Sequence, residues 1–344
     1  MLRSPLENHQ VNLQMEACAN PGCTLNSNKD ALMFNTLGNE YFDRENYSEA
    51  IAAYYHGLKI ERANFEPSHP NIIVTLINIS ESYRRRGDFE LAIEVYFEVF
   101  QLQQQRFGRS HPDVSRTLHA IALIYDEMGD LPRALECNTY SLRLQNLCED
   151  GRDLQNLSVT LTHAGCIFYR MNDISSSKKY FGEALELQRK MNSHAEVAFT
   201  LYNIGLCHQS TGCHRKAIEC YTEALQLEEK VHGRDHRETI PTRFNLGQAF
   251  ISLGQYDKAL SYLQNALRIN RESYTGKEEG PCTEASIMIE MGCVHYFQGN
   301  VEKLFKILSE ISGMSEKNGF NQDSMQLQCL KMFSRSCQSL APAA

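Results

Sequence analysis

Cysteine and histidine gather at one place in the chain, in a pattern that could bind a metal ion. Cys207 and His208 are followed by Cys213 and His214, and then by Cys220. Thiolates and imidazoles are ligands that zinc prefers, so a metal site, or a hydrolytic activity built on one, is one interpretation of Cys207 to Cys220. The competing interpretation is that these side chains fill positions between packed helices. The repeat described below favours packing, and we predict no metal.

Other patterns typical of catalysis are missing from the sequence. It contains no Gly-rich phosphate loop, nucleophile elbow or zincin motif. The acid pairs Asp126-Glu127 and Glu228-Glu229 could take part in acid–base chemistry, but catalysis needs groups that converge in a closed pocket. We interpret both pairs as solvated helix faces, and we expect no catalytic residue, no cofactor and no enzymatic activity.

The composition is typical of a protein that forms a hydrophobic core. Of the 344 residues, 42% are hydrophobic and 22% are charged. The net charge of −8 gives no general attraction to nucleic acid or to an anionic membrane. We see no signal peptide and no apolar run long enough to cross a membrane. Since the twelve cysteines are scattered, we expect a reduced, cytoplasmic protein.

An internal repeat sets the elements that carry these residues. A small residue, which we call the anchor, recurs about every 42 residues, at Gly38, Ser80, Ala122, Gly165, Gly205, Gly247 and Gly292. Large residues, mostly aromatic, follow at three and nine positions after the anchor, a turn residue at seven and a small residue at twelve. Offsets of three, four and seven share one helical face, so each copy predicts two amphipathic helices around a turn. His208 and His214 occupy the large-residue positions of the fifth copy.

A second repeated phrase lies between copies. "FEPSHPNIIVTL" begins at Phe65, "FGRSHPDVSRTL" at Phe107, and the variant "HGRDHRETIPTR" at His232. A Ser before His-Pro, with Pro in the first turn and an acid three residues after the Ser, is typical of a helix start. We therefore predict that each phrase begins a helix, with Ser68, Ser110 or Asp235 as the capping residue.

These patterns resemble the tetratricopeptide repeat in its long form, and they are most similar to the repeats of kinesin light chain. The shared marks are the linker Gly108 to Pro112 and the Thr-Leu pairs Thr75-Leu76, Thr117-Leu118, Thr160-Leu161 and Thr200-Leu201. The resemblance implies an all-α fold, a right-handed α-solenoid (superhelix) of about seven helix-turn-helix repeats over residues 30–313. We expect residues 1–29 to be a disordered polar tail and residues 321–338 to be a C-terminal capping helix, since repeat arrays need polar ends.

The resemblance also implies a function. Members of this family bind extended peptides or partner helices along the face formed by the first helix of each hairpin. It implies a scaffold or adaptor for a protein partner, of the cargo-binding or complex-assembly type, that recognises a linear acidic-plus-hydrophobic segment. Nucleic acid and membrane are not expected partners, and the oligomeric state stays open. The candidate peptide-binding residues are Asn35, Asn39, Asn78, Arg84, Arg85, Arg116, His119, Phe199, Tyr202, Asn203, Phe244 and Asn245.

Capture of a partner's terminal carboxylate is an alternative. Co-chaperone repeats hold such a carboxylate with two Asn and several Lys or Arg. Asn39, Asn78 and Arg116 match three of those positions, whereas Asn35 and Ala120 stand where two cations are needed.

The Asn residues that precede their anchors by two positions have two possible roles. These residues are Asn78, Asn203 and Asn245. A side-chain amide both donates and accepts hydrogen bonds, so it could bind the backbone of a peptide or tie neighbouring hairpins together. The sequence does not decide between these roles.

Overall fold

The computed structural model describes residues 28–147, 153–274 and 284–317, and the regular elements in these ranges are all helical. The predicted capping helix at 321–338 lies outside the described residues, as does the predicted tail apart from Asn28 and Lys29, which begin the first helix. The chain divides into two compact units, residues 1–156 and 157–344.

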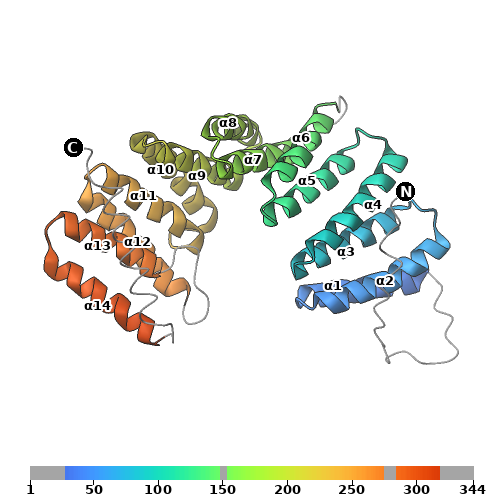
Figure 1. Ribbon diagram of the computed structural model, residues 1–344, viewed down its shortest axis with the longest axis horizontal. Coiled ribbons are helices and arrows are strands. Elements are labelled where there is room, and N and C mark those ends of the chain that lie inside the picture. The colour runs from blue at the N-terminus through green and yellow to red at the C-terminus, as the bar shows by residue number, and fades with distance from the viewer. Residues whose placement is uncertain (1–27, 148–152, 275–283, 318–344) are drawn as a thin grey trace. The chain divides into compact units, whose positions relative to one another are not determined.

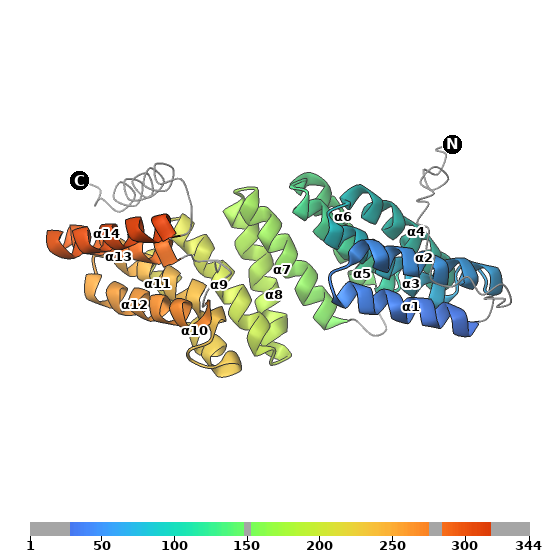
Figure 2. The same ribbon diagram turned by 90° about the horizontal axis from the view of Figure 1, so that it is seen from below.

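The first unit consists of three helical hairpins. Consecutive helices lie side by side in chain order in both views (Figures 1 and 2). The helices are α1 (Asn28–Asp43), α2 (Tyr47–Asn64), α3 (Pro70–Arg86), α4 (Phe89–Phe107), α5 (Pro112–Glu127) and α6 (Leu131–Leu147).

The second unit continues the pattern with four hairpins, the first of which begins three residues before the unit boundary. Its helices are α7 (Leu154–Arg170), α8 (Ile174–Lys190), α9 (His194–Ser210), α10 (His214–His232), α11 (Ile240–Ser252), α12 (Tyr256–Ser273), α13 (Glu284–Phe297) and α14 (Val301–Lys317), with a short 3-10 helix, η2 (Arg237–Thr239), before α11. The predicted pair of helices is therefore present in each of the seven copies. The fold is an all-α solenoid.

The turn inside each hairpin has the same backbone geometry in copies with and without glycine. Gly87 has φ 92°, and Glu45 and Asn172, which replace glycine at the equivalent position, both have φ 62°. A left-handed residue with a side chain costs about 1–2 kcal/mol. The packing of the two helices therefore enforces this turn even where the sequence does not favour it.

The anchor lets the two helices of a hairpin approach closely. A Cβ added to Gly38 would stand 2.4 Å from Cε1 of Tyr54, and one added to Gly205 would stand 2.4 Å from Cε1 of Tyr221. The side chain sixteen residues after the anchor therefore covers it. The predicted small residues at position twelve are fully buried in six copies, at Ala50, Ala92, Ala134, Ser177, Ala217 and Ala259.

The linkers do start helices, but the prediction that Ser or Asp caps them is wrong. The capping residues are His69, His111 and His236, whose Nδ1 atoms accept hydrogen bonds from the backbone N–H two residues later, at 3.2, 3.2 and 3.3 Å. Each imidazole stacks on the aromatic ring four residues earlier, with centroids 3.9, 4.4 and 5.0 Å apart. This stacking fixes the ring so that its nitrogen faces the helix start, which explains the recurrence of the whole phrase.

Candidate partner-binding face

One row of first-helix residues stays exposed although most of its members are apolar. In the first five copies these residues stand six positions before the anchor, and we call them the first-helix face: Leu32, Val74 and Arg116 in the first unit, Val159 and Phe199 in the second. In the last two copies this position holds Pro241 and Ser286, which are half-buried. The four apolar side chains are 67%, 55%, 40% and 54% exposed. Exposed apolar groups at one register of a repeat are typical of a contact surface.

The Thr-Leu pair of the repeat orients this face. Thr75 and Leu76 are each 1% exposed, so they turn inward and leave Val74 outside. Two Thr hydroxyls at this position bond to the second helix of the preceding hairpin: Thr117 Oγ1 donates to Gln103 Oε1 at 2.7 Å, and Thr242 Oγ1, in the copy where Arg243 replaces the Leu, donates to Glu228 Oε1 at 2.8 Å. The pair thus fixes the rotation of the first helix.

The predicted arginines all have carboxylate partners. Arg84 bonds Glu81 of its own helix and Glu127 on α5. Arg85 also pairs with Glu81, and Arg116 pairs with Asp113. The side chains of Arg85 and Arg116 are nevertheless 52% and 56% exposed. The net charge of the surface around these three arginines is therefore closer to zero than the arginines alone indicate.

Two of the predicted asparagines in the first unit hydrogen-bond to scaffold residues, although Asn39 is exposed and Asn35 is half-buried. Asn35 Nδ2 donates to Glu61 Oε1 and to Thr75 Oγ1, both at 2.9 Å. Asn39 Oδ1 accepts from the Tyr54 hydroxyl at 2.7 Å. Asn78 is half-buried on α3.

His119 is buried at 9% exposure and lies 3.2 Å from Asn138 Oδ1. It therefore presents little surface to a partner.

The second unit holds the remaining predicted residues on α9 and α11. Phe199 is exposed, and Asn203 Nδ2 donates to the Phe199 carbonyl at 2.8 Å within the same helix. Asn245 is 7% exposed and donates to the Tyr202 hydroxyl at 2.9 Å, so it ties α11 to α9. Phe244 packs against the core of this unit. As peptide contacts, these residues stay predictions.

A chain of hydrogen bonds in the second unit was not foreseen. The Tyr221 hydroxyl donates to Gln209 Oε1 at 2.8 Å, Gln209 Nε2 to Gln248 Oε1 at 3.2 Å, and Gln248 Nε2 to Glu290 Oε1 at 2.9 Å. It links the first helices of three successive hairpins, α9, α11 and α13. In the sequence, this chain of hydrogen bonds is indicated only by polar residues on the inner faces of these helices.

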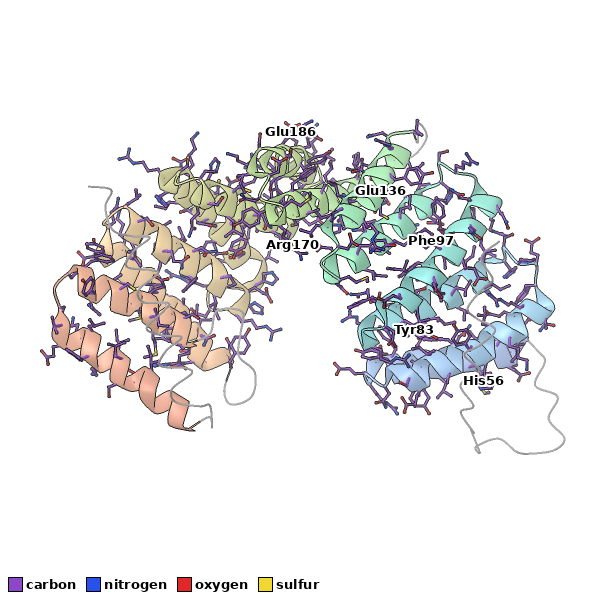
Figure 3. All side chains as sticks on the ribbon, viewed as in Figure 1. His56, Tyr83, Phe97, Glu136, Arg170 and Glu186 are labelled. Carbon is purple, nitrogen blue, oxygen red and sulfur yellow. The ribbon has the colours of Figure 1, made fainter. Side chains whose placement is uncertain are left out.

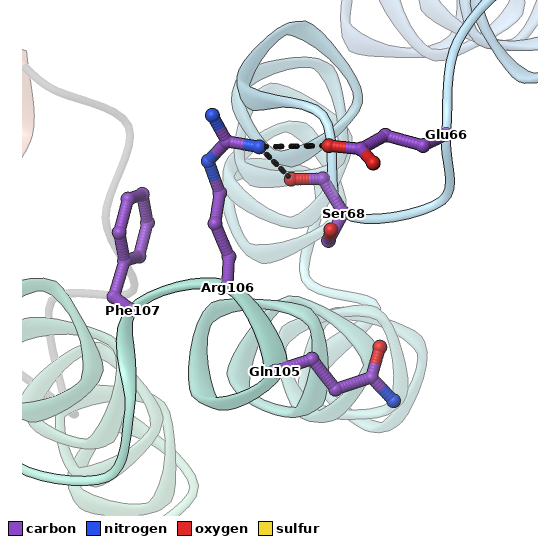
Figure 4. Close-up of a pocket in the computed structure, with 5 residues that line it drawn as sticks. All are labelled: Glu66, Ser68, Gln105, Arg106 and Phe107. Atoms are coloured by element: carbon purple, nitrogen blue, oxygen red, sulfur yellow. Dashed lines mark hydrogen bonds and ion pairs between the residues drawn. The ribbon is translucent and has the colours of Figure 1, made fainter.

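A pocket of about 510 Å³ lies at the linkers of the first unit (Figure 4). Arg106 at the end of α4 donates to a Glu66 carboxylate oxygen at 3.1 Å and to the Ser68 carbonyl at 3.3 Å. Its guanidinium also lies 5.5 Å from the centre of the Phe107 ring. These contacts join two successive linkers, so we interpret the pocket as part of the scaffold.

The Cys/His cluster is spread through the hairpin packing. Cys207 is fully buried with its thiol 3.3 Å from Ser177 Oγ, whereas Cys213 is exposed. Burial, with Glu223 and Glu219 adding to it, raises the pKa of Cys220 to about 11. Within the described ranges, no three His, Cys, Asp or Glu side chains come together as metal ligands would.

The interpretation of Glu228-Glu229 as a solvated face is wrong. Glu228 Oε2 is buried and has no hydrogen-bond partner among the described residues. Glu229 accepts from the guanidinium of Arg243 at 2.6 Å, and Arg243 is only 5% exposed. Both acids therefore face the junction between α10 and α11, because the following hairpin covers a helix side that would otherwise be solvated.

None of the helices in the described part of the chain is long and apolar enough to span a membrane.

Two family models, both described as tetratricopeptide repeat, match the chain. One matches residues 30–99, 82–146 and 196–272, and the other matches residues 160–191. Together the matches extend over more than half of the sequence.

Individual proteins resemble parts of the chain. It is 32% identical over 107 residues to the BBSome complex member BBS4 of Bos taurus, covering 31% of this chain and 17% of the relative. It is 29% identical over 127 residues to the Protein KINESIN LIGHT CHAIN-RELATED 3 of Arabidopsis thaliana, covering 37% and 19%. The chain thus spans less than a fifth of either relative. The crystal structure of BtubC from P. vanneervenii matches with a TM-score of 0.58 at 17% identity, over 69% of this chain and 92% of that one, which is a likeness of fold alone.

Proposed function

The chain belongs to the tetratricopeptide repeat family, whose fold generally serves as a protein-interaction scaffold, and we propose that it is a non-enzymatic adaptor in the cytoplasm. Its partner presents a linear segment with acidic and hydrophobic side chains, which binds along the first-helix face of a unit. The role is cargo binding or complex assembly of the kinesin-light-chain-like kind.

The observation that carries this proposal is the exposure of the apolar members of the first-helix face. Leu32 and Val74 are more than half exposed in the first unit, as is Phe199 in the second. Burying apolar surface yields roughly 25 cal/mol per Å². A partner segment that places an apolar side chain against each of these exposed residues would gain this energy at every such contact.

The acidic part of the segment is supported by the exposed arginines. Among the residues that the structure describes, the ion pairs of Arg85 and Arg116 are with acids four and three residues away on their own helices. Exposed ion pairs of this kind contribute about 0–1 kcal/mol. A carboxylate of the partner can therefore replace Glu81 or Asp113 at little cost.

A capture experiment with the full chain tests the proposal. Proximity labelling would compare the wild type with Phe199→Ala and Val74→Ala, and with Phe97→Ala as the matched control. Phe97, labelled in Figure 3, is an aromatic residue with 41% exposure, but it lies on the second helix α4. We expect partners to be lost with Phe199→Ala or Val74→Ala and kept with Phe97→Ala. Equal loss in all three variants, or none in the first two, contradicts the proposal.

Charge reversal tests the acidic requirement separately. Arg85→Glu and Arg116→Glu should weaken capture, while Arg62→Glu, which changes a half-exposed arginine on the second helix α2, should not. If the reversals leave the captured partners unchanged, the segment is hydrophobic without being acidic.

Capture of a terminal carboxylate is less well supported. Asn39 already accepts from Tyr54, and Asn35 is held by Glu61 and Thr75 in a place where that mode needs a cation. Amidation of the C-terminus of a bound peptide separates the two modes, because only tail capture should lose affinity.

A further inference from the structure

A polar side chain recurs at one buried position of the second helices. It stands 23 residues after the anchor, and its members are Glu61, Gln103, Gln145, Gln188, Glu228 and Asn270. All except Glu228 are 5% exposed or less, and Glu228 is partly buried. Four copies therefore carry a neutral amide at this position, and two carry a carboxyl group.

This position lies between the first helix of its own hairpin and that of the next. Gln188 Nε2 donates to Thr162 Oγ1 on the same hairpin at 3.1 Å, and Gln103 Oε1 accepts from Thr117 on the next hairpin at 2.7 Å. Glu228 makes the same contact as Gln103, since its Oε1 accepts from Thr242 at 2.8 Å. The side chain at this register therefore joins successive hairpins.

Glu228 has no positive partner in this junction. Its other oxygen, Oε2, is buried without a hydrogen bond among the described residues. The guanidinium of Arg243 on α11, whose charge acts on Glu228, is bonded to Glu229 at 2.6 Å and to the Arg234 carbonyl at 3.0 Å. Glu229 of α10 and Glu238 of η2 add negative charge. An ionised Glu228 would thus hold a charge in the junction that the Thr242 hydrogen bond and the more distant charge of Arg243 offset only in part, whereas the protonated acid resembles the glutamine of the other copies.

We propose that Glu228 is a proton-controlled positioning residue, neutral when α10 and α11 are packed together, whose ionisation loosens the junction that holds α11. Burial, the largest cause, raises the pKa of this carboxyl group from its usual 4.5 to about 7, with Glu238 acting in the same direction and the Thr242 hydrogen bond and Arg243 opposing it. The added stability is therefore complete below pH 4.5 and is lost as the pH rises through 7.

The junction also governs the binding face of the second unit. Helix α11 carries Asn245, which holds the Tyr202 hydroxyl on α9 at 2.9 Å. A looser α11 would release Tyr202, so partner binding by this unit should weaken as Glu228 ionises. Only this last consequence rests on the proposed function.

The test compares unfolding of the full-length wild type, Glu228→Gln and the control Glu219→Gln at a series of pH values. Glu219 is an exposed acid on the same helix, and glutamine already occupies the equivalent register in three copies, so both variants should fold. Relative to Glu228→Gln, the folding equilibrium constant of the wild type should fall by up to about a hundredfold between pH 4.5 and 7. Glu219→Gln should follow the wild type.

Parallel pH profiles for wild type and Glu228→Gln would overturn the proposal, because they mean that Glu228 has the same ionisation in the folded and unfolded states. Infrared difference spectra of the wild type give a second measurement, in which a protonated carboxyl band should disappear near neutral pH and be absent from Glu228→Gln. These results require no ligand. Failure of partner capture alone would count against the proposed function and leave the proton site standing.

Discussion

Replacing Gly205 by alanine should destabilise the second unit, although alanine is the better helix former. A Cβ at this position would stand 2.4 Å from Cε1, 2.6 Å from Cδ1 and 2.9 Å from Cζ of Tyr221. These distances are well inside van der Waals contact, so the ring must move.

The ring of Tyr221 has little freedom to move. Its side chain is fully buried, and its hydroxyl donates to Gln209, which continues into the chain through Gln248 to Glu290. Overpacking of this kind costs about 1–3 kcal/mol, and losing the hydroxyl hydrogen bond costs about 1 kcal/mol. Helix propensity returns about 1 kcal/mol. The net loss of stability should be about 1–3 kcal/mol.

Gly292 is the matched control, since it is the anchor of the last hairpin. A Cβ there would meet Leu304 Cδ1 at 3.4 Å and Ile307 Cγ2 at 3.8 Å, which are ordinary contacts. Gly292→Ala should therefore stabilise the protein by about 0.5–1 kcal/mol through helix propensity alone. The same substitution at the same repeat position should thus change the free energy of unfolding in opposite directions at Gly205 and Gly292.

Urea unfolding followed by far-ultraviolet circular dichroism measures both effects. In a double-mutant cycle, the cost of Gly205→Ala should vanish in a Tyr221→Ala background, because the ring that creates the clash is gone. If Gly205→Ala stabilises the protein as much as Gly292→Ala does, the close approach at the anchor is not what selects glycine.

Three further predictions concern single side chains. His111→Ala should cost about 1 kcal/mol for the lost cap and about 0.5–1.5 kcal/mol for the lost stacking on Phe107. His111→Asn should cost less, because asparagine can still cap the helix. Equal losses of stability in thermal unfolding of the two variants would argue against the capping role. Burial, with Arg170 adding to it, lowers the pKa of His163 from 6.5 to about 4, so its contribution to stability is present above pH 6.5 and is lost as the pH falls toward 4. In His163→Gln, the free energy of unfolding should therefore fall less steeply between pH 6.5 and 4 than in the wild type. An unchanged decrease over this pH range would contradict the prediction. At neutral pH, an alkylating reagent should modify exposed Cys213 well before Cys220, whose raised pKa keeps it as the thiol; peptide mass spectrometry would detect the reverse order.

The sequence was sufficient for the architecture. The prediction of a tetratricopeptide-repeat protein is confirmed by the family models, and its kinesin-light-chain-like type is supported by the likeness to the Protein KINESIN LIGHT CHAIN-RELATED 3. The predicted all-α solenoid is confirmed by the helical hairpins. Helical periodicity, turn residues and anchors are local features that recur in every copy. A copy that lacks one of these residues can therefore still be recognised from the other six. Glu45 and Asn172 replace the turn glycine in two such copies, and both adopt the backbone of glycine.

Pairings between hairpins were not accessible from the sequence. Arg84 is held by Glu127, which lies 43 residues away, and Arg243 is buried against Glu229. Periodicity says which face of a helix turns inward, but it does not say which polar group will stand opposite. For this reason the sequence did not reveal the acidic partner of Arg84 on the next hairpin, and it did not show that Glu228 is partly buried.

The amino-acid sequence by itself determined where helices begin, that the large and small residues of the repeat pack between the helices, and that the hairpins stack, because each copy repeats the same helical period and the same turn. Only the tertiary structure decided that histidines cap the linker helices, that Asn245 and His119 lie inside, and that one acid at the α10–α11 junction lacks a partner. Those outcomes depend on the charge and burial that a neighbouring hairpin imposes, and no local pattern records them.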